Sequence, residues 1–203
     1  MSTLNKMIMM KIIFRKVLPA SVFMMLAVVS CKELDLAPAD RFTDANYWTT
    51  LERAETVLNT AYSGMFNSNR FFYNEALSDN AYNGRGDNEG VMSISAGLAD
   101  ASLGRFSSEW NSRYACIKTT HIFLENIDRV TGVNESLRNR MKAEARFIRA
   151  FQYFQLYTWF GDVPLFQNDI SLNEAKTITR AARAEVVDFV LGELQELESL
   201  LPA

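Results

Sequence analysis

The sequence contains very little of what metal sites and catalytic triads are built from. Its 203 residues include a single histidine, His121. One histidine excludes multi-histidine metal sites and the usual histidine-based triads within this chain. His121 shares an apolar helical stripe with Tyr114, Ile117 and Leu124. We therefore interpret it as a core residue hydrogen-bonded to a neighbour, and we expect no metal site and no catalytic residue.

Strand patterns and basic runs are also missing. No segment alternates apolar and polar residues over the length of a strand, so we expect an all-α fold. The apolar content of 48% is enough for one domain with its own core. The formal net charge is −3, and an acidic chain without a basic run attracts phosphate backbones only weakly. We therefore expect no nucleic-acid partner.

The first thirty residues have the pattern of a secretory signal. Four basic residues precede an uncharged run over residues 17–29, which is too short for a comfortable membrane span. The run ends in VVSC, which resembles the lipobox of bacterial lipoproteins. Cleavage there would leave Cys31 as a lipidated N-terminus and lower the net charge to about −7. The true start is Met1 or Met10.

The remaining cysteine then has no partner. With Cys31 lipidated, a disulfide framework is excluded, and we interpret Cys116 as a small buried apolar residue on a helix. Residues 31–48 are expected to be a lipidated tether and an entry segment, in which Phe42, Tyr47 and Trp48 dock onto the domain that follows over residues 49–203.

The first helix of that domain is expected to start at Thr49, because Thr49 and Glu52 stand in the arrangement of a capping box. Periodicity is lost from residue 67 to about residue 102, which predicts a long irregular loop, with short helical turns at most. A loop of this length in a compact domain is more often functional or mobile than filler.

Two long helices joined by a short turn are expected next. The first covers about residues 106–130, and Asn134 can cap the second, on which Arg140 and Glu144 are spaced for an i,i+4 ion pair. Together they form an antiparallel helical hairpin.

The second of these helices continues into the segment 143–165, AEARFIRAFQYFQLYTWFGDVPL, around which we expect the fold to be organised. Its apolar residues form two adjacent stripes, so other elements must cover more than one of its sides. Gly161 and Pro164 predict where the helix stops. We interpret Trp159 and Phe160 as core residues rather than as a sugar-binding pair.

An extended polar connection over residues 163–176 and a last helix over residues 180–202 complete the predicted elements. Glu193, Glu196 and Glu198 fall on the predicted exposed side of that helix, and we interpret them as a solvated face.

Together these segments resemble the SusD/RagB family of outer-membrane lipoproteins of Bacteroidetes. The segment 143–165 is similar to the family signature, and three further segments agree in order: the lipobox, the stretch from Trp110 that runs into LENID, and the last helix ending in LLP. One departure is Ala182, which stands where the family has a serine or threonine cap. Loss of that cap would fray one helix end at a cost of about 1 kcal/mol.

The resemblance implies tetratricopeptide-like helical hairpins on the cell surface that hold a polysaccharide or oligosaccharide, or sometimes a peptide. The partner it implies is a SusC-type TonB-dependent transporter, and the membrane is reached through the lipid anchor. The family has no enzymatic activity and needs no cofactor. Its members are much longer, so residues 49–203 are expected to be an incomplete N-terminal domain.

The candidate ligand-binding residues lie in the polar loop. Aromatic rings can stack on sugar C–H surfaces, while amide, carboxylate and guanidinium groups bind hydroxyls. The loop supplies such groups in Tyr73, Asp79, Asn80, Tyr82, Asn83 and Arg85. Turn chemistry explains the same residues. Two other functions stay open: a membrane-anchored helical scaffold with no small ligand, and a glycan-cleaving enzyme, for which no carboxylate pair stands out.

Overall fold

The computed structural model describes residues 44–86 and 88–201. The predicted signal peptide, Cys31 and the tether up to residue 43 lie outside the described residues. The helices are α2 (Asp44–Tyr47), α3 (Leu51–Met65), α4 (Ser68–Asn74), α5 (Val91–Ser95), α6 (Gly104–Asn126), α7 (Glu135–Phe160), α8 (Leu172–Ala175) and α9 (Arg183–Leu197), with 3-10 turns η1 (Glu75–Leu77), η2 (Asn88–Gly90) and η3 (Ile127–Arg129).

The predicted all-α fold is confirmed. In the described part of the chain, pairing of the strand type is limited to one bridge between Val163 and Ala181. No helix in those ranges combines the length and apolar character needed to cross a bilayer.

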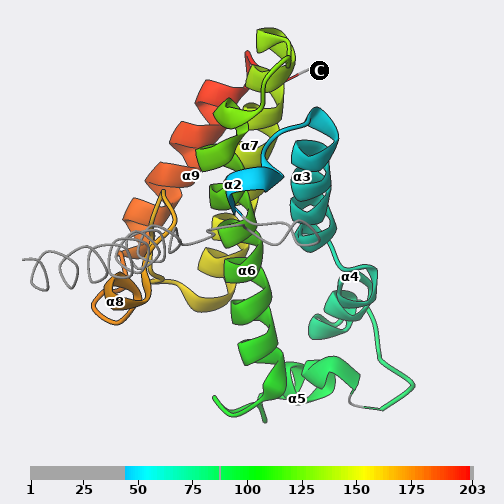
Figure 1. The fold of residues 1–203 in the computed structure, drawn as a ribbon. Helices are drawn as coiled ribbons and strands as arrows, with labels where there is room; N and C mark the ends of the chain where they lie inside the picture. The colour runs from blue at the N-terminus through cyan, green and yellow to red at the C-terminus, as the bar shows by residue number, and fades with distance from the viewer. Residues whose placement is uncertain (1–43, 87, 202–203) are drawn as a thin grey trace, which may run out of the picture. The chain divides into compact units, whose positions relative to one another are not determined.

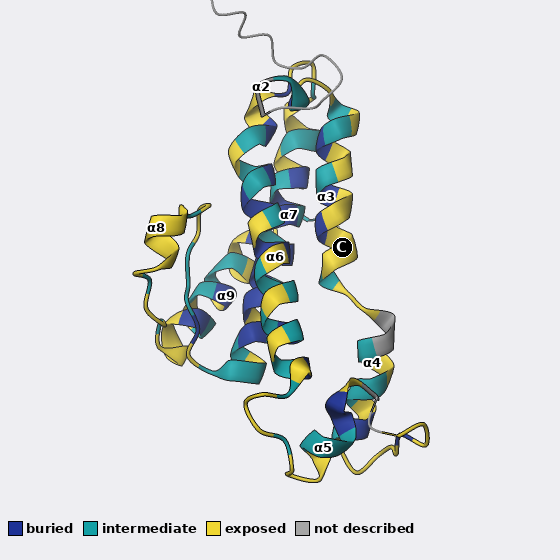
Figure 2. Cartoon of the chain, turned by 60° about the horizontal axis from the view of Figure 1, so that its bottom comes forward, coloured by how far each residue is buried: buried dark blue, intermediate teal, exposed yellow. Residues whose placement is uncertain are grey.

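Helix α7 is the centre of the packing, as the segment 143–165 predicts. It runs antiparallel to α6 as the predicted hairpin, and it also contacts α3 and α9 (Figure 1). Figure 2 shows buried positions on the faces where these long helices meet.

Two apolar clusters share α7. In the first, Ile148 packs with Leu58 of α3 and Phe123 of α6. In the second, Tyr153 and Leu156 pack with Ile117 of α6, the segment after α7, and α9. The two halves of α7 therefore bury against different neighbours, and its contacts with α3, α6 and α9 confirm that more than one of its sides is covered. Phe154, which lies on one of the predicted stripes, is 45% exposed.

The entry segment docks as predicted where it is described. Trp48 is 5% exposed and belongs to the first cluster, with its ring centroid 6.4 Å from that of Phe123 in an edge-to-face arrangement. Such aromatic pairs contribute about 0.5–1.5 kcal/mol beyond the area they bury.

The helix-start predictions have mixed outcomes. Asn134 caps α7, since its side chain accepts a hydrogen bond from the Ser136 N–H at 2.8 Å. The predicted Arg140–Glu144 pair is present at 3.2 Å.

The capping box predicted at Thr49 and Glu52 is wrong. The N-cap of α3 is Thr50, whose side chain makes no capping hydrogen bond, and the residue three positions on is Arg53. Thr49 lies one residue outside the helix, and its hydroxyl accepts a hydrogen bond from Arg53 at 2.8 Å. Thr49 and Glu52 have the spacing of a capping box, but α3 begins one residue later than that spacing requires.

A capping box does occur in the connection after α7. The Ser171 side chain accepts from the Glu174 N–H and the Glu174 carboxylate accepts from the Ser171 N–H, so α8 forms where the sequence predicts an extended segment. The end of α7 is as predicted, because Gly161 has a φ of 68°, a conformation that favours glycine. The loop over residues 67–102 contains α4, α5 and two 3-10 turns.

Helix α9 begins at Arg183 with Ala182 as its N-cap, and Ala182 offers no side-chain hydrogen bond. The Asp162 carboxylate, just after α7, accepts a hydrogen bond from the Arg183 N–H at 2.8 Å instead. A negative charge at a helix N-terminus is favourable. A residue distant in sequence therefore replaces part of the missing cap.

We expect Asp162→Ala to lower the free energy of unfolding by about 1 kcal/mol, since it removes the acceptor at the start of α9. Adding Ala182→Ser to that variant should restore most of the loss by supplying a local cap. Urea unfolding followed by circular dichroism measures both. An Asp162→Ala protein as stable as the wild type would contradict this role.

Candidate functional site

A pocket of about 560 Å³ opens where α6 begins and α7 ends. Four of its lining residues are aromatic, two are polar and one is an alanine: Phe106, Trp110, Trp159, Phe160, Ser107, Arg180 and Ala101. We call this the aromatic pocket. Its volume lies within the range of about 300–1,000 Å³ of small-molecule sites, but it is open to solvent over much of its extent.

The rings of the aromatic pocket are held by each other. The Phe106 and Trp159 centroids are 6.3 Å apart, and those of Trp110 and Phe160 are 5.2 Å apart, both edge-to-face. Trp110 also packs against Tyr114 at 4.9 Å. All four pocket rings stay partly exposed, so their surfaces are fixed in position and still reach solvent.

Two guanidinium groups frame the indole rings. Arg180 lies over Trp110 and Arg105 over Trp159, at 5.5 and 5.4 Å from the ring centroids. Arg180 is also anchored by a hydrogen bond to the Asp162 carbonyl at 3.1 Å. Arg180 lines the pocket and can donate to a ligand hydroxyl, whereas Arg105 is 4% exposed and is not among the lining residues.

The interpretation of Trp159 and Phe160 as core residues is incomplete. Phe160 does pack against the second cluster, but both residues also line the aromatic pocket. The sequence does contain a signal for their partial exposure. Both rings lie at the end of the helix, directly before Gly161, and the end of a helix is less completely covered by neighbours than its middle. Pairing with Trp110 could not be foreseen, because it depends on how α6 docks on α7.

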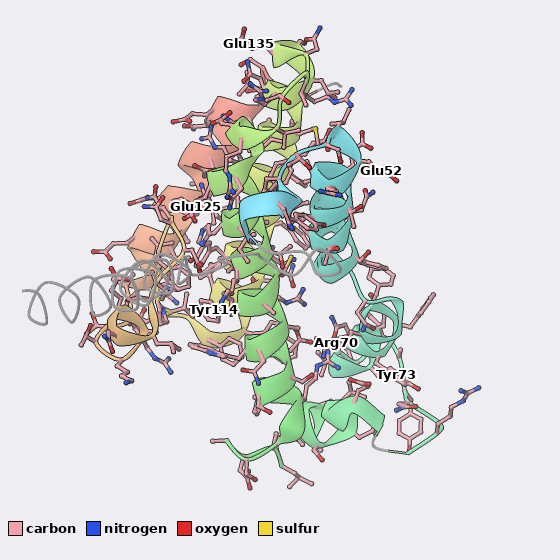
Figure 3. All side chains as sticks on the ribbon, viewed as in Figure 1. Glu52, Arg70, Tyr73, Tyr114, Glu125 and Glu135 are labelled. Carbon is pink, nitrogen blue, oxygen red and sulfur yellow. The ribbon has the colours of Figure 1, made fainter. Side chains whose placement is uncertain are left out.

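The six candidates in the polar loop are not brought together at this pocket, because none is among its lining residues. Tyr73 lies on α4 (Figure 3) and is partly buried. Asp79, Asn80 and Arg85 are exposed, and Tyr82 is 78% exposed. Their role in ligand binding stays a prediction.

Asn83 is the one buried candidate. Its side chain donates to the Gly86 carbonyl at 2.6 Å and accepts from the Arg85 N–H at 3.1 Å. Both contacts shape the loop itself, which is the turn chemistry that asparagine provides.

The solvated face predicted for α9 is wrong at Glu193. This carboxylate pairs with Arg146 at 3.0 Å and with Arg149 at 3.2 Å, both on α7. Burial raises the pKa of Glu193, but the hydrogen bonds and charges of the two arginines outweigh it and hold the pKa below its usual value. Glu196 also contacts Arg146, whereas Glu198 is exposed.

His121 is a core residue, as predicted, and is 1% exposed. The predicted hydrogen bond is wrong, because neither ring nitrogen has a partner among the described residues. The ring packs edge-to-face on Phe166 at 5.6 Å. Burial and the charge of Arg149 lower the pKa of His121 to about 4, against the opposing charge of Asp169. The imidazole is therefore neutral at pH 7.

The lowered pKa makes stability depend on pH. Below pH 6.5, the ordinary value, the unfolded chain takes up a proton that the folded chain does not, so stability falls as pH falls toward 4. Between pH 7 and pH 5 we expect the wild type to lose about 2 kcal/mol more than His121→Asn. Urea unfolding at several pH values measures this, and equal pH dependence of the two proteins would contradict it.

The described residues contain no group of three or more histidine, cysteine, aspartate and glutamate side chains placed to hold a metal. The fold is that of an α-helical hairpin protein, and its aromatic pocket presents four rings with few polar groups.

Comparison with known proteins shows the family to which the chain belongs. Residues 34–203 match the SusD-like family model described as starch-binding and associating with the outer membrane. The chain belongs to the SusD-like family.

Three relatives illustrate the match. A SusD-like protein of Formosa agariphila is 27% identical over 178 residues, which cover 85% of this chain and 34% of that protein. The crystal structure of a SusD-like carbohydrate binding protein from Bacteroides fragilis is 30% identical with a TM-score of 0.68, over 77% of this chain and 32% of that one. A second SusD-like structure from B. fragilis is 25% identical with a TM-score of 0.70, over 82% and 32%.

The chain therefore spans about a third of the length of these relatives. The SusD/RagB resemblance and the tetratricopeptide-like helical fold are confirmed.

Proposed function

We propose that this chain belongs to a surface lipoprotein that captures a glycan for import through a SusC-type TonB-dependent transporter. Family membership supports this, together with the carbohydrate-binding relative from B. fragilis. The observation that carries the proposal within this chain is the aromatic pocket, which two indole rings and a guanidinium group line.

The chemistry of the pocket suits a sugar. A pyranose ring has an apolar face of C–H groups, which stacks on an indole, and hydroxyl groups at its rim, which need donors and acceptors. Trp110 and Trp159 supply ring surface, of which a guanidinium group covers one face of each, and Arg180 and Ser107 supply polar groups. A peptide is the other ligand class that the resemblance implies, and it belongs in the same binding screen.

Anchoring through Cys31 and exposure on the outer face of the outer membrane are parts of the same proposal. They rest on the VVSC motif and on the family, whose printed description is of association with the outer membrane. Co-purification of a TonB-dependent transporter with the protein from its native membrane tests the partner. If the protein binds glycan but no transporter co-purifies with it, the proposal is reduced to glycan capture without the transporter.

The pocket is tested by binding of the purified protein to a panel of neutral polysaccharides, measured by affinity electrophoresis and titration calorimetry. We expect Trp159→Ala and Trp110→Ala to weaken binding about tenfold, because each removes a stacking surface. Circular dichroism checks that the variants are folded.

Two further variants make the result specific. Phe72→Ala removes an aromatic ring that is 73% exposed and lies outside the pocket, and it should bind as the wild type does. Tyr82→Ala tests the polar loop. Loss of binding in Tyr82→Ala with unchanged binding in both tryptophan variants would move the site from the pocket to the loop. Binding to no glycan and to no peptide would leave the scaffold function instead.

A further inference from the structure

A second pocket, of about 260 Å³, lies between the end of α3, helix α4 and the middle of α6 and α7. Its lining shares no residue with the aromatic pocket and consists of aromatic rings, amide groups, two arginines and one methionine: Phe66, Phe71, Phe151, Asn67, Asn74, Gln155, Arg70, Arg113 and Met65. No lining residue is acidic. We call it the arginine pocket.

The arginines of this pocket are fixed by a buried carboxylate behind them. Glu109 of α6 is 1% exposed, and Arg113 Nη2 donates to its Oε2 at 2.9 Å. Arg105 pairs with the same carboxylate at 2.9 Å, and Arg70 Nη1 lies 3.7 Å from it. Three guanidinium groups therefore surround one carboxylate.

The charges do not balance within the described residues. Besides Glu109, the carboxylate in this cluster is Glu89, which pairs with Arg105 at 3.5 Å and not with the two arginines that line the pocket. Three positive charges stand against two negative ones, and the excess lies on the pocket side. An excess cation in a partly buried site favours an anionic ligand, because water screens it less there than on an open surface.

The geometry of Arg70 favours a carboxylate in particular. Its guanidinium donates to the hydroxyls of Ser112, at 2.9 Å, and Ser108, which hold it against α6; Figure 3 shows the side chain between α4 and α6. With Nη1 on Ser112 and Nη2 on Ser108, the edge of Arg70 that these hydrogen bonds leave for a ligand is Nε–H together with the second hydrogen of Nη2. A guanidinium held in place loses little entropy on binding, and two parallel donors on one edge match a carboxylate.

The rest of the lining suits a sugar ring. Phe66 and Phe71 are 58% and 52% exposed, with centroids 5.4 Å apart, and form an open apolar surface beside the arginines. Asn67, Asn74 and Gln155 add amide groups that can bind hydroxyls. The volume is small for a ligand site, where about 300–1,000 Å³ is usual, and is suited to one ring rather than to an oligomer.

We infer that the arginine pocket binds a uronate unit of an acidic glycan, with its carboxylate on Arg70, beside the charge of Arg113, and its ring against Phe71. This inference rests on the proposed glycan capture and names a substrate class for it. The aromatic pocket would then hold a neutral unit of a glycan and the arginine pocket a charged one.

The test is titration of the purified protein with sodium glucuronate and sodium galacturonate, followed by ligand-observed NMR. Their methyl esters are matched neutral probes that keep the ring and lose the charge. We expect the esters to bind about tenfold more weakly than the acids, and Arg70→Gln to weaken binding of the acids about tenfold while leaving the esters unaffected.

Two variants separate binding from folding. Phe71→Leu removes an exposed ring without touching the charge network and should weaken both acids and esters. Arg140→Gln removes an exposed arginine on α7 that pairs with Glu144, and it should bind all probes as the wild type does.

Equal binding of acids and esters would overturn the inference, as would acid binding that survives Arg70→Gln. N-acetylphenylalanine is the probe for a peptide carboxylate, and tighter binding of it than of either uronate would also overturn the inference. Retained binding of neutral glycans in a protein that binds no uronate would refute the uronate site alone. A protein that binds neither neutral glycans nor uronates would refute glycan capture as well.

Discussion

The packing of one helix against three others is the constraint on which this structure depends. Helix α7 is covered by a different pair of neighbours in each half: α3 and α6 in the first, α6 and α9 in the second. Burial of apolar surface contributes about 25 cal/mol per Å², so a helix covered on several sides gains more from docking than a surface helix does. The aromatic pocket exists because the end of α7 meets the start of α6.

Polar groups on α7 complete this packing. Arg149 is 6% exposed and donates to the Gln167 carbonyl at 2.7 Å while it pairs with Glu193 of α9. The Tyr153 hydroxyl donates to the Phe166 carbonyl at 2.8 Å and accepts from the Phe166 N–H at 3.1 Å. These contacts fix the segment after α7, and that segment carries Asp162, which caps α9. The hub helix therefore positions both its neighbours and the connection between them.

Local signals in the sequence predicted what local forces decide. The apolar spacing of α6 and α7, the cap at Asn134 and the stop at Gly161 depend on residues close in the chain, and all are found in the structure. The solvent exposure expected for Glu193 is wrong because its arginine partners lie 44 and 47 residues away, where spacing carries no information. The pocket residues Trp110 and Trp159 come from separate helices, so only docking brings them together. The Ser171 capping box was a local signal that the polar composition of its segment obscured.

Native-state hydrogen exchange tests the central position of α7 most directly. If the fold depends on its coverage by three helices, the amides from Ile148 to Leu156 exchange only by global unfolding and are the slowest in the protein. The amides of residues 91–103, in α5 and the loop after it, exchange faster by local opening. Exchange in the second half of α7 that is as fast as in α4 or α5 would contradict the account.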